Sequence, residues 1–464
     1  MSVAAPPTAT AAAIDALAAL LGPRLSRSPS DLALHGASET HFAPAPPDAV
    51  AYPHSTDEVA RIMAICARHH VPVTGWGTGT SLEGHALAIH GGVTVDFSRM
   101  DRVLEVAAED MLAVVQPGVT REALNTELRA TGLFFPVDPG ANASLGGMAA
   151  TRASGTTAVR YGTMRDNVLA LEVVLADGRV IRTGSRAPKS SAGYDLTALM
   201  VGSEGTLGLI TELTLRLRGQ PEAVSAAICA FPAMGPAVEA VIATIQSGIP
   251  MARIEFVDAA TAAAFNAASG AGMADCPHLM VEFHGSPASV AEQSERFGEI
   301  VADLGGADFR WATRPEDRTA LWKMRHNAFY SCKALYPDRP PIVTDVCVPI
   351  SRLAQAVDET VAEIAASGIP GPIVGHVGDG NFHAMLMPRP DCAEDLATAR
   401  RLASAMSERA LRLGGTVTGE HGIGIGKRAY MAAEHGAGWD VMGALKVALD
   451  PAGLLNPGKL VAGD

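Results

Sequence analysis

Residues 138–162 read DPGANASLGGMAATRASGTTAVRYG, a long run with few large side chains. Glycine, alanine, serine and threonine at this density leave the backbone open, so a flat or extended ligand can lie against it. The alternative is a tight crossing of strands, in which glycines make room for a neighbouring backbone. The stretch therefore marks either a binding surface or a packing point, and a second feature is needed to choose between them.

A second glycine-rich loop, GWGTGTSLEG at 75–84, follows a short apolar stretch. Alternating glycines from Gly75 to Gly79 let backbone N–H groups approach a phosphate, and the neighbouring hydroxyl side chains add donors. The Rossmann fingerprint is excluded, because that motif opens a helix, whereas this chain continues past His85 into the strand-like GGVTVDF. Asp96, in that strand, is therefore interpreted as a strand-end aspartate and not as a ribose ligand. Two such loops in one half of the chain favour a large bound cofactor.

Composition indicates a globular protein: 48% of the residues are hydrophobic, 18% are charged, and the net charge is −13. The negative charge argues against nucleic acid as a partner, because phosphate binding needs a positive surface. No apolar run reaches the roughly 18 residues of a membrane helix, and ATAAAIDALAALLG at 9–22 predicts a short surface helix. No basic residue precedes Arg24, and the 6 cysteines show no CxxC spacing. These features predict free thiols and a cytoplasmic location, with peripheral membrane contact left open.

The hydrophobic patterns predict an α+β fold. A capping box, Ser55 to Glu58, opens a helix over 55–70, and two hairpins are expected at 103–119 and 170–184, the second turning at Asp177-Gly178. Long alanine-rich helices then separate strands such as LMVEFHG at 279–285. We divide the chain into an N-terminal helical segment (1–47), a cofactor-binding domain (48–220), a substrate-binding cap domain (221–415) and a C-terminal segment returning to the cofactor domain (416–464).

Two histidines, His376 and His383, flank a sharp polar turn in GHVGDGNFHA. A two-residue turn centred on Asp379-Gly380 would place them directly opposite each other, with their side chains on one face of a hairpin. Two imidazoles so placed can share a divalent ion; the alternative is a stacked or hydrogen-bonded histidine pair.

The segment GEHGIG at 419–424 offers a carboxylate and a further histidine, Glu420 and His421. A divalent ion bound by two histidines usually needs a third ligand of this kind. A solvated Glu-His turn is the alternative. Arg325 in WKMRHNAFY is a candidate for gripping a carboxylate through two parallel hydrogen bonds, although most helical arginines simply face water.

Several segments in order along the chain resemble one family, the vanillyl-alcohol-oxidase type of FAD-binding protein, in its D-lactate dehydrogenase and glycolate oxidase branch. The matching segments are VPVTGWGTGTSLEGHA, PVDPGANASLGGMAATRASGTTAVRYG, YDLTALMVGSEGTLGLITELTLRL, WKMRHNAFY, TDVCVPISRL, GHVGDGNFH, GEHGIGIGKRAYM and LLNPGKL. The resemblance implies a two-subdomain FAD-binding domain and an α+β cap domain with an antiparallel sheet.

The resemblance also implies the FAD contacts. They are Gly75, Gly77, Thr78, Gly79, Thr80 and Ser81 in the first loop, Pro139, Ser144, Gly146, Gly147, Ser154, Gly155 and Tyr161 in the second, and Gly205, Ile210 and Asn456 further on. Some relatives attach FAD covalently through a histidine at the position that aligns near Thr80. This chain is therefore expected to bind FAD noncovalently, with His85 a packing or surface residue.

In similar proteins, the positions of His376, His383 and Glu420 hold Zn²⁺ or Mn²⁺, the position of His421 is the catalytic base, and the position of Arg325 binds the substrate carboxylate. The resemblance thus implies oxidation of a D-2-hydroxy acid, D-lactate above all, with electrons passed to an external cytochrome, quinone or electron-transfer flavoprotein. A homodimer is also considered. The alternatives are glycolate or D-2-hydroxyglutarate as substrate, a non-redox FAD synthase of the same superfamily, a flavin-free metal-dependent hydrolase or lyase, and a binding subunit of a larger complex.

Overall fold

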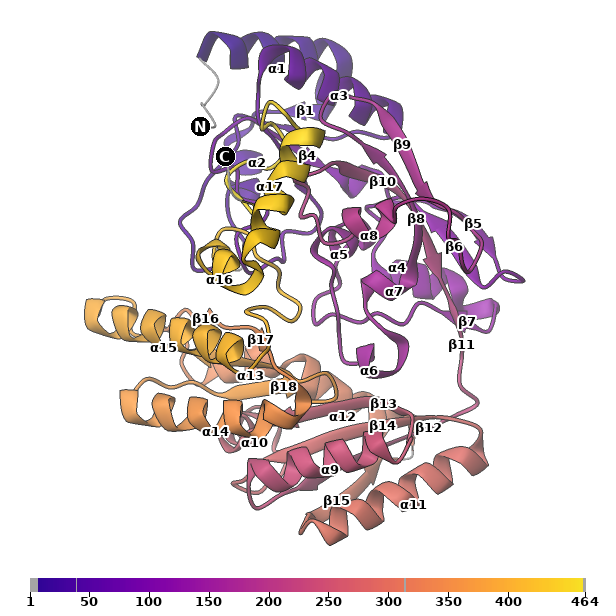
Figure 1. Ribbon diagram of the computed structural model, residues 1–464, viewed down its shortest axis with the longest axis vertical. Coiled ribbons are helices and arrows are strands. Elements are labelled where there is room, and N and C mark those ends of the chain that lie inside the picture. The colour runs from indigo at the N-terminus through magenta and orange to yellow at the C-terminus, as the bar shows by residue number, and fades with distance from the viewer. Residues whose placement is uncertain (1–6, 39, 313, 462–464) are drawn as a thin grey trace. The chain divides into compact units, whose positions relative to one another are not determined.

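The computed structural model (Figure 1) describes residues 7–461 apart from 39 and 313, and it divides into two compact units. The first unit comprises Met1–Ser154, Thr163–Gln220 and Glu420–Asp464, and the second comprises Gly155–Gly162 and Pro221–Gly419. The short segment Gly155–Gly162 belongs with the second unit although the chain on both sides of it belongs to the first. The four functional parts expected from the sequence stay a prediction.

The first unit begins with a small sheet, in which parallel pairing joins β2 to β4 and β4 to β3. The strand order is β1 (Leu25–Ser26), β2 (Ala49–Ala51), β4 (Val93–Asp96) and β3 (Val73–Trp76). Helix α3 (Thr56–His69) packs against α1 (Pro7–Leu21), the surface helix predicted from the sequence. Both helices bury one apolar side in a shared core, because their apolar residues recur at helical spacing.

The capping box predicted for α3 forms only in part. Ser55 Oγ accepts a hydrogen bond from the Glu58 backbone N–H at 3.3 Å. The Glu58 carboxylate turns instead to Arg24 and to the backbone N–H of His54. A charged partner competes successfully with the cap backbone, because a charge-assisted hydrogen bond is roughly twice as strong as a neutral one.

The second sheet of the first unit is antiparallel, with the order β5-β6-β10-β8-β9. Its strands are β5 (Val103–Ala107), β6 (Leu112–Val115), β10 (Leu209–Arg216), β8 (Val168–Val174) and β9 (Val180–Gly184). Both predicted hairpins are confirmed, and Gly178 has the positive φ of 87° that its turn requires. The other α-helices and strands described for this unit are α2 (Pro29–His35), α4 (Arg121–Glu127), β7 (Leu133–Phe134), α5 (Leu145–Thr151), α7 (Met164–Asn167), α8 (Leu196–Met200), β11 (Arg218–Gly219), α16 (Met431–His435) and α17 (Ala437–Leu449).

The second unit is built on one antiparallel sheet with the order β15-β12-β14-β13-β18-β19-β16, and β17 also pairs with β19. Its strands are β12 (Ala223–Ala230), β13 (Met251–Val257), β14 (His278–Gly285), β15 (Ala307–Ala312), β16 (Ile342–Val343), β17 (Val346–Cys347), β18 (Ile373–His376) and β19 (Asn381–Leu386). An antiparallel sheet was expected for this part of the chain.

Helices cover both faces of this sheet (Figure 1). The larger core holds α9 (Met234–Gln246), α11 (Pro287–Asp303), α14 (Ile350–Ser367) and α15 (Ala393–Arg412) against one face. The smaller core holds α10 (Ala259–Ser269), α12 (Pro315–His326) and α13 (Ala328–Ala334) against the other. The short helix α6 (Ala158–Tyr161) packs on β13.

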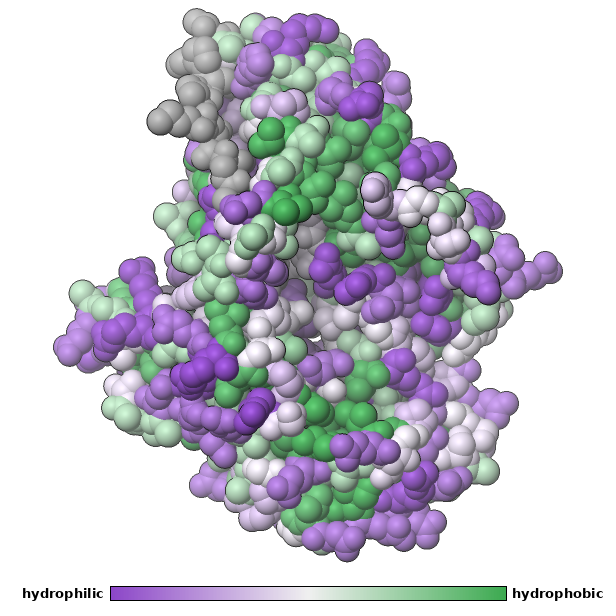
Figure 2. Space-filling model, in the orientation of Figure 1, coloured by the Kyte–Doolittle hydropathy of each residue, from purple (hydrophilic) through white to green (hydrophobic). Residues whose placement is uncertain are grey.

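Hydrophilic side chains are spread over the face of the molecule in Figure 2. Among the residues described, no helix has the length and apolar character needed to span a membrane.

Candidate active site

The two glycine-rich loops of the first unit lie against each other. A Cβ atom added to Gly77 would lie 2.3 Å from Ser144 Oγ and 3.6 Å from Gly147 Cα. Gly79 has φ +72°, and a Cβ there would lie 2.4 Å from the Trp76 ring. Gly77 therefore leaves room for the Ser144 side chain of the other loop, and both the positive φ and the Trp76 ring favour glycine at position 79. The structure thus brings together two of the stretches expected to contact FAD.

The remaining loop residues are placed around this contact. The hydroxyls of Thr78 and Thr80 lie 3.2 Å apart. Ser144 precedes α5, and a Cβ on Gly146 would lie 2.4 Å from Pro117 Cβ. Tyr161, in the segment that belongs to the second unit, has its hydroxyl 2.8 Å from His284 Nδ1.

The third predicted stretch surrounds Glu204, which is 5% exposed. Its carboxylate accepts hydrogen bonds from the backbone N–H groups of Ile423 at 2.7 Å and Gly424 at 2.8 Å, and it lies 3.2 Å from His85 Nε2. Burial alone would raise the pKa of this carboxyl, but His85 and the two N–H donors together hold the pKa below its usual range. His85 is itself 5% exposed, so it is not a surface residue. Gly205, next in the chain, has φ +70° and open space around it.

Asn456 has both of its side-chain polar atoms engaged within the first unit. Its Nδ2 donates to the carbonyls of His85 at 3.0 Å and Glu204 at 2.7 Å, and its Oδ1 accepts from Lys459 Nζ at 2.6 Å. Lys459 Nζ also donates to the carbonyls of His85 and Leu87. Burial lowers the pKa of Lys459 to about 7. The amide therefore joins loops of the protein, and its expected FAD contact stays a prediction.

The register predicted for the histidine hairpin is wrong. His376 pairs with Asn381 and His383 with Val374, so the histidines are diagonal neighbours instead of directly opposite. The turn spans residues 377–380, because His376 pairs with Asn381, and the Gly380 carbonyl accepts a hydrogen bond from the Val348 N–H at 3.0 Å. A register shift of two residues keeps every side chain on its face. The two imidazoles therefore still face the same side, with ring centroids 5.5 Å apart in an edge-on arrangement.

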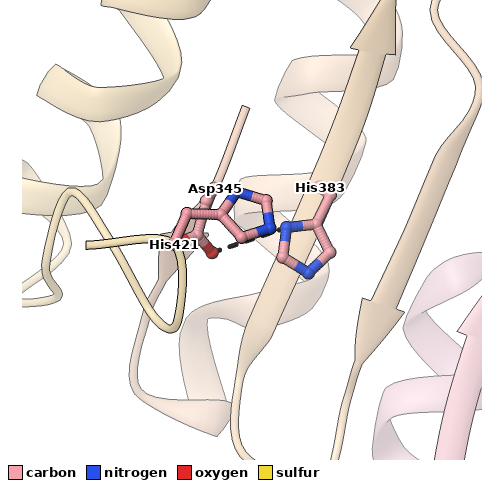
Figure 3. Close-up of side chains that lie close together, drawn as sticks. All are labelled: Asp345, His383 and His421. Atoms are coloured by element: carbon pink, nitrogen blue, oxygen red, sulfur yellow. Dashed lines mark ion pairs between the residues drawn. The ribbon is translucent and has the colours of Figure 1, made fainter. Parts of the chain in front are cut away.

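Glu420 and His421 follow Gly419, the last residue of the second unit, directly in the chain. Ligand atoms of His376, His383 and Glu420 lie within 4.8 Å of one another, and those of Asp345, His383 and His421 form another such group, drawn in Figure 3. The two groups share His383, so an ion bound by one group would occupy a ligand of the other.

Asp345 is fully buried, and its carboxylate accepts hydrogen bonds from the segments around it. Its Oδ1 accepts from Asn381 Nδ2 at 2.7 Å, and its Oδ2 accepts from Thr418 Oγ1 at 2.6 Å and from the Gly419 N–H at 2.8 Å. These bonds tie the segment before Glu420 to the sheet. Asp345 therefore anchors this segment, and its Oδ1 also lies 3.4 Å from His383 Nδ1.

Arg325 lies on α12, only 7% exposed, and its guanidinium NH2 is 2.6 Å from Glu255 Oε2. Glu255 is 1% exposed, and its Oε1 lies 2.8 Å from His376 Nδ1. The predicted arginine is thus not a surface residue, and it is linked to a predicted metal ligand through a carboxylate that the sequence reasoning missed. An acid inside the apolar strand MARIEFV was the available signal.

A second buried network was also missed, on the same face of the sheet. Glu282 accepts from Trp322 Nε1 at 2.5 Å and contacts His284 Nε2 at 2.8 Å, and His284 in turn contacts Tyr161. Side chains alternate between the faces of a strand, so Glu255, Glu282, His376 and His383 all project toward the face covered by α10, α12 and α13. The apolar strands around them gave no hint that these polar groups would share one face.

Comparison with known proteins places this site in a family. Residues 47–184 match the family model described as FAD binding domain, and residues 220–460 match the model described as FAD linked oxidases, C-terminal domain. The chain belongs to the FAD-linked oxidase family.

Relatives of high identity cover most of the chain. It is 50% identical over 431 residues, 92% of this chain and 87% of the relative, to a probable mitochondrial D-lactate dehydrogenase of Danio rerio. A mitochondrial D-lactate dehydrogenase [cytochrome] of Arabidopsis thaliana is 44% identical over 97% of this chain and 80% of its own length. Glycolate oxidase subunit GlcD of Bacillus subtilis is 36% identical over 90% of each chain.

Solved structures share the fold at low identity. A 4-ethylphenol oxidase from Gulosibacter chungangensis matches with a TM-score of 0.79 at 18% identity, covering 99% of this chain and 98% of its own. An alkyldihydroxyacetonephosphate synthase matches with a TM-score of 0.73 at 20% identity, covering 96% and 84%. These neighbours confirm the α+β, vanillyl-alcohol-oxidase-type fold expected from the sequence.

Proposed function

We propose that this protein is an FAD-dependent dehydrogenase that oxidises a D-2-hydroxy acid, D-lactate in particular, to the 2-oxo acid. Support comes from the relatives of high identity, two of which carry the name D-lactate dehydrogenase. The structural observation behind the proposal is the gathering of His376, His383, Glu255 and Arg325 on one face of one sheet. Imidazoles and a guanidinium so placed suit an anionic substrate that carries a hydroxyl group.

The glycine loops fit FAD held without a covalent bond. Gly77 and Gly79 carry no side chain, so the backbone N–H groups of the first loop can approach a diphosphate, and the Ser144 hydroxyl of the second loop lies beside Gly77. The contacts proposed for FAD are those expected from the sequence. Some relatives carry a histidine that links to flavin at the position of Thr80. Threonine has no imidazole, so this link cannot form here.

His376, His383 and Glu420 are the ligands proposed for a divalent ion, Zn²⁺ or Mn²⁺. Two imidazoles and one carboxylate form a set typical of a catalytic zinc site, which keeps one position open for substrate. Their ligand atoms lie within 4.8 Å of one another, close enough for one ion to draw them together.

The residues of this chain divide the work of the reaction. Arg325 holds the substrate carboxylate, and its several N–H donors allow it to do so while one nitrogen stays beside Glu255. His421 takes the proton of the substrate hydroxyl, because an imidazole titrates close to neutral pH. Bound FAD supplies the acceptor for the hydride from C2, and a bound metal lowers the pKa of the hydroxyl.

A small monocarboxylate is favoured over a dicarboxylate. A second acid group would need a further cation, and Lys333 and Arg339 are the candidates that follow Arg325 in the chain. Lys333 is exposed and lies over the Phe329 ring, and Arg339 donates to the carbonyl of Met387. Neither is paired with the Arg325 and Glu255 group, so this part of the site offers one strong carboxylate partner.

The electron acceptor is proposed to be external: a cytochrome, a quinone or an electron-transfer flavoprotein. The 6 cysteines are free, and three of them are buried within apolar cores. A cytoplasmic location and a homodimer belong to the same proposal. Two of the relatives named above are called mitochondrial, so a mitochondrial location is the alternative to be tested alongside.

The visible spectrum of the purified, metal-loaded protein, recorded without oxygen before and after adding D-lactate, tests the function. Bleaching of the flavin band is the expected result, and the rates with glycolate, D-2-hydroxyglutarate and L-lactate then rank the substrates. A yellow protein that none of these acids reduces would contradict the dehydrogenase. A non-redox reaction of the synthase type would then be the favoured hypothesis, since one structural neighbour is named a synthase.

A further inference from the structure

Glu255 joins two groups that lie far apart in the sequence. Phe256 pairs with Gly375 across β13 and β18, and one step further along this register Glu255 stands opposite His376. The Glu255 Oε1 lies 2.8 Å from His376 Nδ1, and Oε2 lies 2.6 Å from the Arg325 guanidinium. The carboxylate is 1% exposed, so water cannot replace either partner.

The carboxylate beside Nδ1 determines which nitrogen of His376 can act as a metal ligand. The hydrogen-bond arrangement assigns the Nδ1 proton as the donor to Glu255, which leaves the Nε2 lone pair as the acceptor site. Such carboxylate–histidine pairs orient a metal-binding imidazole and raise its basicity. Nε2 is then the nitrogen of His376 that would bind an ion shared with His383.

Arg325 makes the burial of this carboxylate possible. A lone buried carboxylate would be strongly destabilising, and the guanidinium at 2.6 Å supplies the opposite charge. The same contact fixes one end of the guanidinium on the face of the sheet. Glu255 thus holds a residue proposed for the metal with one oxygen and a residue proposed for the substrate with the other.

We infer that Glu255 is a positioning residue that orients His376 for metal binding while anchoring Arg325. The inference rests on the metal site of the proposed function. It assigns no direct contact with substrate or cofactor to Glu255.

The test is the affinity of the FAD-loaded protein for Mn²⁺, measured by competition with a chromophoric chelator. Glu255→Gln keeps the shape and removes the charge, and it should weaken Mn²⁺ binding about 10- to 100-fold, as is typical for loss of a metal-orienting partner. Glu282→Gln is the matched control: it removes a buried carboxylate on the neighbouring strand β14 that also contacts a histidine. This control should leave the Mn²⁺ affinity within about threefold of wild type, because His284 is not among the candidate ligands.

Glu255→Gln leaves the charge of Arg325 buried without a partner, and this variant could fail to fold. The double variant Glu255→Gln, Arg325→Met removes both charges, and Arg325→Met alone retains the carboxylate at His376. We expect the double variant to lose Mn²⁺ affinity and the single Arg325→Met variant to keep it. Folded proteins that lack Glu255 yet bind Mn²⁺ as tightly as wild type would overturn the inference.

The role of Glu255 and the proposed function can be refuted independently, the first by the Mn²⁺ affinity and the second by flavin reduction. If Glu255→Gln loses Mn²⁺ affinity while no 2-hydroxy acid reduces the wild-type flavin, Glu255 is a positioning residue in an enzyme of another reaction. If D-lactate bleaches the flavin and Glu255→Gln binds Mn²⁺ normally, the proposed function stands and the role of Glu255 is refuted.

Discussion

At the scale of single residues, His421 is the position on which the proposed chemistry depends most. It follows Glu420 directly, and its Nε2 lies 3.8 Å from Glu420 Oε1. A side chain that removes the hydroxyl proton need not be required for FAD binding or for folding. Loss of a general base typically slows a reaction about 10²- to 10⁴-fold.

We therefore expect His421→Gln to slow anaerobic flavin reduction by D-lactate by about that factor, with an unchanged flavin spectrum before substrate is added. Stopped-flow absorbance measures the rate. His435→Gln, at an exposed histidine that ends α16, is the control and should reduce its flavin at the wild-type rate. A His421→Gln protein with the wild-type rate would show that another group takes the proton.

At the scale of elements, α3 is tied to the chain before it by an ion pair at its N-terminal end. The Arg24 guanidinium contacts both oxygens of Glu58, at 2.5 Å and 2.6 Å. Hydrogen bonding to Arg24 is the main cause that lowers the pKa of Glu58 to about 2, against a smaller opposing effect of burial. The pair is about one-fifth exposed, which reduces its contribution to stability.

The sign of the pH effect follows from the lowered pKa. Because Glu58 is more acidic in the folded protein than in the unfolded chain, its contribution is complete above about pH 4.3 and is lost as the pH falls toward 2. We expect Glu58→Gln to destabilise the protein by about 1–2 kcal/mol at pH 7, a value already reduced for partial exposure. The difference in melting temperature from wild type should shrink below pH 4.3. A difference that stays constant down to pH 3 would refute the ion pair as its source.

The hairpin of β18 and β19 makes a second prediction at this scale. Gly380 has φ +78°, and an added Cβ would lie 2.0 Å from the carbonyl oxygen of Val348. Both the positive φ and the clash oppose alanine, so Gly380→Ala should destabilise the protein by about 2–4 kcal/mol. It should also weaken Mn²⁺ binding, because the turn places His376 and His383.

Gly298→Ala is the matched control for that substitution. Gly298 lies within α11, and an added Cβ would meet no atom within 4 Å. Alanine favours helix over glycine by about 1 kcal/mol, so this variant should melt at or above the wild-type temperature. Thermal melting of the two variants side by side checks both expectations, and a Gly380→Ala protein as stable as Gly298→Ala would contradict the first.

At the scale of the whole molecule, each unit has its own hydrophobic core. The first unit contains the clusters around α3 and around the antiparallel sheet, and the second contains the two clusters on either face of its large sheet. The proposed FAD contacts lie mainly in the first unit, whereas His376 and His383 lie in the second. Ligands that bind one folded unit stabilise that unit by mass action.

Calorimetry should therefore resolve two transitions. FAD at one hundred times its dissociation constant should stabilise one of them by about 2.7 kcal/mol. Mn²⁺ at the same excess should stabilise mainly the other, because His376 and His383 lie in the second unit, whereas Glu420 is the first residue of the last segment of the first unit. Removal of metal with a chelator should reverse only the second shift. A single transition that both ligands raise together would show that the units unfold as one.

Local sequence patterns predicted several elements of this structure correctly. The residues at helical spacing in α3 are buried as predicted: Val59, Ile62, Met63 and Cys66. The predicted turn at Asp177-Gly178 is also present. The face shared by His376 and His383 was predicted correctly from a wrong register, because a shift of two residues preserves the face of a strand. These features depend on neighbours only a few residues away.

The sequence by itself determined the glycine loops, the hairpins and the residue types at the site. Only the tertiary structure decided that Glu255 stands between His376 and Arg325, that Asp345 anchors Gly419, and that Gly155–Gly162 belongs with the second unit. The reason is physical: β13 and β18 are adjacent in the sheet although 121 residues separate Glu255 from His376. Side-chain periodicity specifies the face of each strand, whereas the order of strands depends on the packing of the whole sheet.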